Sequence, residues 1–401
     1  MTGSSNATWV TAAACNYLPQ VRVLASSFSA HHPGRRMKVL ITDTPPTGVD
    51  MSAEPYDVLY SNDVGIPSSW LMTHTRKELG AAGKPGIMLH ALAHGSDSVI
   101  YVDPDSIILA PMLDVEEMVA RHSITVSPHL LGPLDADDAT GRFIEDRILE
   151  AGIYNGGMIG ATGREEARAF LEWWTHVLGY GCNHDLASAQ HFDQRWLEML
   201  PSFVVNWGRF TDPGLNVSFW RIPEDELLSG NAAIDPRTSR HIHFSGFVPE
   251  RPDNLVFYFP ELLTVDDVPA LAPAYREYAT ALERAGRSEW RSVPYGFGYF
   301  EDGEPIPDVG RQVYAQMGSV RDRFGDPFRS GAGSFQEWLG SAADDGHPVI
   351  TREWAERHRR SEDLRAAFPE PLGAERAAFH AWTQTDEARD SRAIPYILFQ
   401  Q

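Results

Sequence analysis

Two aspartates, Asp103 and Asp105, follow a short apolar run and are the residues of this chain best placed to do chemistry. The run, residues 98–102 (SVIYV), is rich in strand-favouring side chains, so it predicts a buried strand with the two carboxylates at its carboxyl end. In extended backbone, residues two positions apart lie on one face. Two oxygen ligands on one face can hold Mg²⁺ or Mn²⁺ and leave positions open for phosphate oxygens. The pattern predicts a metal site suited to a nucleoside diphosphate.

The same triplet, Asp103-Pro104-Asp105, is also a good turn sequence. Proline fixes one backbone dihedral, and aspartate accepts hydrogen bonds from nearby backbone amides. The triplet alone does not separate the turn from the metal site. The rest of the chain must supply further ligands and a sheet edge on which they can meet.

The elements expected to position this triplet are those of an α/β sheet. Residues 8–14 and 37–42 predict buried strands, and apolar residues at helical spacing between 18 and 28 predict a connecting helix. Such a unit pairs its strands in parallel through a right-handed crossover. Further strands are expected at 57–60, 98–102, 124–126, 203–205 and 241–244, and further helices at 70–79, 85–94, 165–178 and 193–200. The order predicts a Rossmann-like fold whose mostly parallel central sheet is flanked by helices.

The chain, at 401 residues, is longer than one typical domain of ~100–200 residues. After residue 262 the pattern changes to helical segments separated by loops rich in glycine, proline and acidic residues. We therefore expect an α/β domain over residues 1–262 and a mainly helical C-terminal region over residues 263–401.

Charge and cysteine content restrict the partners. The formal net charge of −21 argues against a nucleic-acid surface and against an anionic membrane face, because both need clustered basic residues. Cys15 and Cys182 are the two cysteines, so a disulfide framework is excluded. Residues 1–8 lack a signal-peptide pattern, and no apolar run approaches the ~18 residues of a membrane span. We expect a cytoplasmic protein without a transmembrane segment.

Short motifs follow one another in an order that resembles a known family. They are Asn16-Tyr17, Asp103-Pro104-Asp105, Asn155-Gly156-Gly157, Asp193-Gln194 and His243-Phe244-Ser245-Gly246. Across about residues 8–255, this order resembles the retaining glycosyltransferases of the GT-A fold called family eight, which includes bacterial lipopolysaccharide galactosyltransferases and glycogenin. The resemblance implies a nucleotide-sugar-binding catalytic domain over residues 1–262. It also implies transfer of a sugar from a nucleotide diphosphate sugar to a bacterial glycan, glycolipid or natural-product acceptor. The donor that the resemblance favours is a UDP-sugar.

The resemblance assigns three metal ligands, Asp103, Asp105 and His243. In the family the corresponding groups hold a divalent cation that bridges the diphosphate of the donor. An imidazole ligand favours Mn²⁺ over Mg²⁺. The alternative for His243 is a strand histidine whose ring nitrogens are satisfied by hydrogen bonds within the protein.

The resemblance also assigns the catalytic pair, Asp193 and Gln194, near the anomeric carbon. Asp193 offers a carboxylate to the developing oxocarbenium ion, and Gln194 offers a hydrogen bond to the sugar or the acceptor. Attack by a protein nucleophile and same-face attack, in which the leaving phosphate takes the acceptor's proton, both remain open. The alternative for Asp193 is a helix cap.

The donor-binding residues complete the set of expected site residues. They are Asn16, Tyr17, Lys84, Asp103, Asp105, Asn155, Gly157, Gly246 and Arg251. The chain departs from the family in two places. Ala14-Cys15 stand where many members have a base-reading aspartate, and Pro249 stands where the family has a lysine, so Arg251 is expected to contact the phosphate instead.

Two other functions fit parts of the pattern. Haloacid-dehalogenase phosphatases also place two aspartates after a buried strand, with the first as nucleophile. That function expects threonine or valine where Ile107 stands and leaves Asp193 and His243 without a role. A catalytically inactive nucleotide-sugar-binding protein would keep the fold and lose turnover. The C-terminal region either covers an acceptor or mediates a homo-oligomer, and the sequence favours neither.

Overall fold

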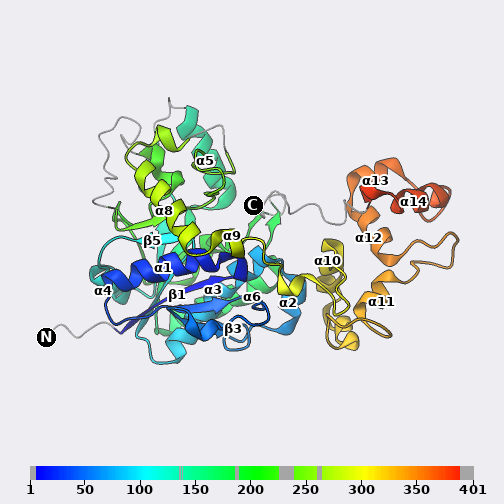
Figure 1. The fold of residues 1–401 in the computed structure, drawn as a ribbon, viewed down its shortest axis with the longest axis horizontal. Coiled ribbons are helices and arrows are strands. Elements are labelled where there is room, and N and C mark those ends of the chain that lie inside the picture. Colours follow the sequence, from blue (N-terminus) through cyan, green and yellow to red (C-terminus); the bar gives the residue numbers. More distant parts are fainter. Residues whose placement is uncertain are drawn as a thin grey trace. The chain divides into compact units, whose positions relative to one another are not determined.

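The structure, a computed structural model, describes residues 6–134, 137, 139–185, 189–224, 239–259 and 264–388. The chain separates into two compact units, and its ribbon is drawn in Figure 1. Unit 1 comprises Met1–Pro67 and Arg76–Tyr295, and unit 2 comprises Ser68–Thr75 and Gly296–Gln401. The domain limit expected at residue 262 from the sequence stays a prediction.

A seven-stranded sheet forms the centre of unit 1, in the order β10-β6-β7-β4-β1-β2-β3. Its strands are β1 (Ala7–Ala13), β2 (Lys38–Ile41), β3 (Asp57–Tyr60), β4 (Ser98–Val102), β6 (Ile124–Pro128), β7 (Tyr154–Thr162) and β10 (Trp207–Arg209). Four of the six neighbouring pairs are parallel, and β7 runs antiparallel to both of its neighbours. The mostly parallel α/β sheet predicted from the sequence is confirmed.

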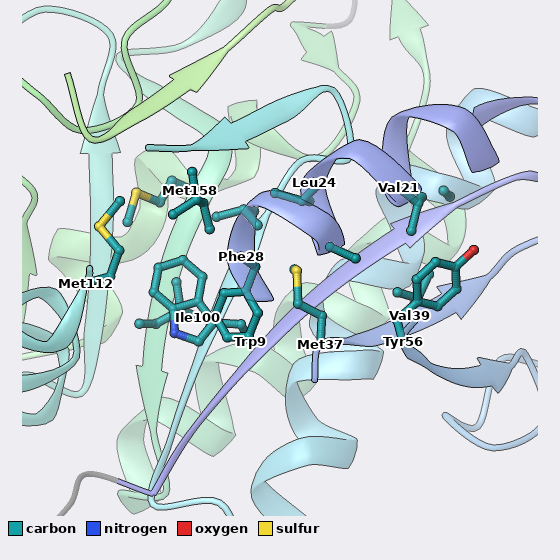
Figure 2. Packing of buried hydrophobic residues seen from close by; sticks show 14 of the residues in the cluster. Trp9, Val21, Leu24, Phe28, Met37, Val39, Tyr56, Ile100, Met112 and Met158 are labelled. Carbon is teal, nitrogen blue, oxygen red and sulfur yellow. The ribbon is translucent and has the colours of Figure 1, made fainter. Parts of the chain in front are cut away.

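Helices cover both faces of this sheet, as a parallel sheet requires to bury its apolar strands. On one face, side chains of α1 (Leu18–His31) and α4 (Leu113–Arg121) share a core with the sheet. Figure 2 shows Trp9 and Phe28 packed side by side in this core, with ring centroids 5.7 Å apart. α3 (Arg76–Ala93) and α6 (Glu165–Gly181) pack against each other, and α3 also packs against β1 and β4.

The remaining elements of unit 1 surround the sheet. β5 (Ser106–Ile108) pairs with β11 (His241–His243), and β8 (His184–Asp185) pairs with β9 (Gln190–His191), each as a small antiparallel sheet. The helices are α5 (Ala139–Ala151), α7 (Leu200–Phe203), α8 (Ala272–Arg284) and α9 (Arg287–Trp290). Apolar side chains of α5, α8 and β11 form a further core, against which Ile107 of β5 packs.

Four local predictions are wrong. The helix expected at 70–79 is divided between α2 (Ser68–Thr73) and α3, with a break at His74 and Thr75. The strand expected at 203–205 is not formed, because Pro201 opens the short helix α7 and the edge strand β10 follows it at Trp207. The helix expected to start at Pro85 is part of α3, which runs through this proline. Buried side chains on both sides of Pro85 offset the backbone hydrogen bond that proline cannot make. The helix expected over 193–200 is a 3-10 segment, Gln194–Met199, that leads into α7.

Unit 2 is mainly helical, as the sequence predicts for the C-terminal region. It contains α2 (Ser68–Thr73), α10 (Asp308–Gln316), α11 (Phe335–Gly340), α12 (Arg352–Arg360), α13 (Glu362–Ala367) and α14 (Arg376–Thr383). Met72 of α2 packs with Val309, Val313 and Phe335 in a core of this unit's own. Over the residues that the structure describes, no helix has both the length and the apolar character needed to cross a membrane.

Gly160 tests the packing of α4 on the sheet. A Cβ at this position in β7 would lie 2.5 Å from Cγ2 of Val119, a stiff β-branched side chain. We expect Gly160→Ala to lower the free energy of unfolding by about 1–3 kcal/mol, the range for overpacking a close-packed core. Urea denaturation measures the change, and Gly132→Ala is the control, because nothing lies within 4 Å of a Cβ built there. Equal stability of both variants would contradict this packing.

Candidate active site

The two aspartates lie where β4 ends. The pairing of β4 with β7 places Val102 opposite Met158, and the next amide, that of Asp103, donates to the carbonyl of Gly157 at 2.9 Å. The side chains of Asp103 and Asp105 are 20% and 21% exposed, so both are partly shielded yet open on one side. The sheet edge therefore presents both carboxylates beside the glycines of β7.

A long-range strand pairing brings His243 to this edge. β11 pairs antiparallel with β5, and the register puts His243 opposite Ser106, the residue after Asp105. The amide of Phe244 also donates to the carbonyl of Asp105 at 2.8 Å. As a result, Nε2 of His243 lies 3.3 Å from Oδ1 of Asp105 and 3.6 Å from Oδ2 of Asp103.

These three side chains have the geometry of a metal site. Their potential ligand atoms all lie within 4.8 Å of one another. Neighbouring ligands of an octahedral cation with bonds of ~2.1 Å lie about 3 Å apart, so the distances of 3.3 and 3.6 Å fit with little movement. Two carboxylates and one imidazole form a donor set that suits Mn²⁺ and also accepts Mg²⁺.

Gly157 makes room for the imidazole. A Cβ at Gly157 would lie 2.4 Å from Nδ1 of His243 and 2.7 Å from Oδ1 of Asn155. Neither distance is compatible with a side chain, so only glycine fits between the two groups. Asn155 is buried, and its Oδ1 accepts a hydrogen bond of 2.7 Å from the Gly157 amide. The Asn-Gly-Gly motif thus holds the backbone beneath the histidine.

Lys84 connects the metal-type cluster to Asp193. Its Nζ lies 3.0 Å from Oδ1 of Asp103 and 2.9 Å from Oδ2 of Asp193, and it donates to the carbonyl of Gly156 at 3.0 Å. Burial alone would lower the pKa of Lys84, but the two carboxylates outweigh burial and raise it. Lys84 is therefore a charged group fixed between two acids.

Asp193 does not act as a helix cap. It precedes the 3-10 segment, but its side chain makes no capping hydrogen bond, and its carboxylate faces Lys84. Burial raises the pKa of Asp193, and the Lys84 ammonium offsets this increase only in part. Its approach depends on a second glycine, because a Cβ at Gly156 would lie 2.5 Å from Oδ2 of Asp193.

Gln194 is held by two backbone groups. Its Oε1 accepts a long hydrogen bond of 3.5 Å from the Gly156 amide, and its Nε2 donates to the carbonyl of Ala151 at 3.0 Å. The side-chain amide of Gln194 is therefore held beside Gly156, the glycine that Asp193 and Lys84 also approach.

The predicted residues near the base and phosphate lie in the 3-10 turn Cys15–Tyr17 after β1 and in the segment that follows β11. Asn16 and Tyr17 follow β1, and Oδ1 of Asn16 is a buried atom without a hydrogen-bond partner among the described residues. Burial raises the pKa of Tyr17, and the nearby charge of Asp105 raises it further. Gly246 has a φ of +73°, and a Cβ there would lie 2.6 Å from the ring of Tyr258. Arg251 stands exposed on the turn after this loop, with its amide bonded to the carbonyl of Val248.

Sequence reasoning missed three contributors to the site. The buried Tyr101 donates its hydroxyl to Oδ1 of Asp103 at 2.9 Å, and the two-residue strand spacing could have indicated this shared face. Gly156 is part of the Asn155-Gly156-Gly157 motif, but the motif does not indicate that the absence of a side chain there leaves space for the Asp193 carboxylate. Arg287 of α9 acts on the pKa of Tyr17 and pairs with Glu250 at 3.1 Å, a contact between distant segments that no local pattern signals.

Comparisons with known proteins find only distant structural likeness. No protein-family model matches the chain, and no curated protein matches it in sequence. Among solved structures, a galactosyltransferase, LgtC, in complex with donor and acceptor sugar analogues is 15% identical, with a TM-score of 0.38, over 72% of this chain and 97% of that chain. GlyE of Streptococcus pneumoniae TIGR4, a glycosyltransferase, is 13% identical, with a TM-score of 0.41, over 73% and 67%.

The bifunctional glycosyltransferase WbbM is 9% identical, with a TM-score of 0.41. The match covers 71% of this chain and about half, 52%, of WbbM. The chain is thus similar in fold to these structures of glycosyltransferases, at low identity and low TM-scores.

The pairing of His243 with Asp105 predicts how stability depends on pH. Burial alone would lower the pKa of His243, but Asp105 outweighs it and raises that pKa above its ordinary 6.5. Burial would raise the pKa of Asp105, but His243 outweighs it and lowers that pKa below 3.8. The contribution of His243 to folding stability is complete below pH 6.5 and is lost as the pH rises through its raised pKa. The contribution of Asp105 to folding stability is complete above pH 3.8 and is lost as the pH falls through its lowered pKa.

We therefore expect His243→Gln to destabilise the metal-free protein more at pH 5 than at pH 8.5. Urea unfolding of both proteins in chelator, at both pH values, measures the difference. The same loss of stability at the two pH values would show that the His243–Asp105 pair is not charged in the folded protein.

Proposed function

We propose that this protein is a metal-dependent retaining glycosyltransferase. It moves a sugar from a nucleoside diphosphate sugar to a glycan, a glycolipid or a natural-product acceptor. The preferred candidate for the donor is a UDP-sugar. The observation that carries this proposal is the convergence of Asp103, Asp105 and His243 with the Lys84–Asp193 ion pair at one edge of the sheet.

The proposed ligands of the cation are Asp103, Asp105 and His243. When bound there, Mn²⁺ or Mg²⁺ neutralises the diphosphate and stabilises the negative charge that develops as the nucleoside diphosphate leaves. Tyr101 fixes the orientation of Asp103 through its hydroxyl, and the pairing of β5 with β11 fixes His243. The ligands are therefore preorganised by the fold, which lowers the cost of assembling them around a cation.

Lys84, Asp193 and Gln194 are the proposed groups on the sugar side. The Asp193 carboxylate, which pairs with the Lys84 ammonium, is suited to stabilise positive charge at the anomeric carbon. Gln194, held by backbone bonds to Gly156 and Ala151, presents its amide to the sugar or the acceptor. Asn155 and Gly157 support this side of the site through β7.

The contacts of Asp103 disfavour the phosphatase alternative. A nucleophilic aspartate needs one oxygen free for attack, but Oδ1 of Asp103 meets the Tyr101 hydroxyl and Lys84, and Oδ2 faces His243. An inactive sugar-nucleotide-binding protein would share the same geometry. Hydrolysis of the donor in the absence of acceptor distinguishes the two. An active transferase hydrolyses the donor with added Mn²⁺ and not with chelator, whereas a protein that only binds the donor does not hydrolyse it under either condition.

The metal ligands give the first test of the function. We expect Asp103→Asn and Asp105→Asn to reduce Mn²⁺-dependent hydrolysis of a UDP-sugar by at least about a hundredfold, because each removes a charged ligand. The melting temperature without metal, measured at pH 8.5 where the His243–Asp105 pair contributes least, should stay near that of the wild type, since removing one of three clustered carboxylates also relieves their repulsion. Mass spectrometry of a panel of nucleotide sugars measures the released nucleoside diphosphate.

Asp57→Asn is the matched control, because Asp57 of β3 is a half-exposed carboxylate that pairs with Arg36. It should hydrolyse the donor at the wild-type rate. Wild-type turnover in Asp103→Asn, or equal turnover in chelator and in Mn²⁺, would refute metal-dependent transfer by this site.

Asp193 gives a second test that separates catalysis from metal binding. We expect Asp193→Asn to lower the turnover number by about a hundredfold or more, since the amide cannot stabilise a cationic transition state as a carboxylate does. The affinity for Mn²⁺, measured by calorimetry in the presence of the nucleoside diphosphate, should change little. A variant that loses metal binding and turnover together would place Asp193 in the metal site instead.

A further inference from the structure

Two histidines lie one helical turn apart at the end of α3. His90 is in the last turn of this helix, and His94 directly follows its final residue. The amide of His94 still donates to the carbonyl of His90 at 3.1 Å, so the helical turn continues through both residues. Their rings stack, with centroids 3.9 Å apart and ring planes 21° apart. Two imidazoles therefore lie on one face of the helix end, as residues four positions apart do.

Backbone carbonyls determine which nitrogen of each ring carries the proton. Nδ1 of His90 lies 2.9 Å from the carbonyl oxygen of Asp63, and Nδ1 of His94 lies 2.8 Å from that of His90. A carbonyl oxygen can only accept, so each Nδ1 donates, and the Nε2 of each neutral ring is left with a lone pair. Neither Nε2 has a hydrogen-bond partner among the residues that the structure describes.

This hydrogen-bond pattern is typical of histidines that bind a metal. A metal-bound histidine usually donates its other ring N–H to a backbone carbonyl or a carboxylate, which fixes the tautomer and makes the ligating nitrogen more basic. Two histidines at positions i and i+4 of a helix can also share one cation. With bonds of ~2.05 Å, neighbouring nitrogen ligands of Zn²⁺ lie about 3.3 Å apart, close to the spacing of the two stacked rings.

Capping of the helix accounts for only part of this arrangement. Nδ1 of His94 satisfies the His90 carbonyl, one of the last carbonyls of α3, as a side-chain cap does. That role needs one donor, and it uses neither Nε2 nor a second imidazole. A cation at this place would in addition be favoured by the negative end of the helix macrodipole.

The histidine pair lies away from the candidate active site. Residues 94–97 connect α3 to the start of β4 at Ser98, whereas Asp103 follows the last residue of that strand. A strand rises ~3.3 Å per residue, so β4 puts roughly 15 Å between its two ends. No third histidine, cysteine or carboxylate of the described residues is close enough to complete a ligand set with the pair. Water would therefore fill the remaining coordination positions.

We propose that His90 and His94 together bind one transition-metal cation of the class Zn²⁺, Ni²⁺ and Cu²⁺ at the end of α3. Imidazole nitrogen suits these cations, with the highest affinity for Cu²⁺, whereas Mg²⁺ and Mn²⁺ prefer oxygen ligands. His90 is bonded to Asp63 in the turn after β3, so the cation holds the last turn of α3 against that turn. This site goes beyond the proposed function and does not rest on it.

Calorimetry with Ni²⁺ tests the site. We expect His90→Gln and His94→Gln each to weaken one Ni²⁺-binding event of the wild type by about tenfold or more, because glutamine keeps the length of the side chain but offers no ring nitrogen. Asp103, Asp105 and His243 can also bind Ni²⁺. That second event is recognised because His243→Gln weakens it and leaves the first unchanged.

Hydrogen exchange locates the bound cation. The amides of His94 and Ser96 donate to the carbonyls of His90 and Ala91 in the last turn of α3. We expect Ni²⁺ to slow exchange of these amides in the wild type and in His243→Gln, and to have no such effect in His90→Gln or His94→Gln.

His176→Gln is the matched control, because His176 is an exposed histidine of α6 whose ring contacts Tyr180, four residues later, instead of a second imidazole. It should bind Ni²⁺ as the wild type does. Wild-type affinity and exchange in both variants of the pair would overturn the proposal. A loss in only one of these two variants would indicate binding by a single imidazole and would also overturn it. An equal loss in His176→Gln would show binding by surface histidines in general, with the same consequence.

Discussion

The site depends on the placement of three carboxylates, Asp103, Asp105 and Asp193, around one buried ammonium at a sheet edge. Like charges in a partly dehydrated environment repel strongly, so such a group persists only with compensating positive charge. Lys84 compensates Asp103 and Asp193, and His243 compensates Asp105. Even with a protonated histidine, three negative charges face two positive ones. The excess favours a bound cation, and the cation in turn favours an anionic substrate.

The backbone makes this arrangement possible through two glycines. Gly156 admits the Asp193 carboxylate and Gly157 admits the His243 ring, each at a distance where a Cβ would collide. β7 runs antiparallel between β4 and β6, so its first residues lie beside the carboxyl end of β4. One strand therefore controls the approach of both His243 and Asp193. This explains why the motif contains two consecutive glycines inside a buried strand, where glycine is otherwise unfavourable.

Local patterns in the sequence predicted what neighbouring residues determine. The apolar run at 98–102 and the short run at 57–60 were recognisable as strands, and the two-residue spacing placed Asp103 and Asp105 on one edge. The prediction at 203–205 was wrong because apolar residues suit a helix turn as well as a strand, and Pro201 favours the helix. The pairing of β5 with β11 joins segments far apart in sequence, so only the resemblance pointed to His243. The contact of Tyr101 with Asp103 depends on side-chain direction and escaped the motif search.

Helix α3 unites these observations, because it brings the Lys84 ammonium to the carboxylates on one rigid element. Lys84 is buried two turns from the helix start, where its charge is fully compensated by Asp103 and Asp193 and cannot be offered to a ligand without separating them. The acidic chain thus places one of its three lysines inside the group of carboxylates, where a positive charge is needed to hold them together.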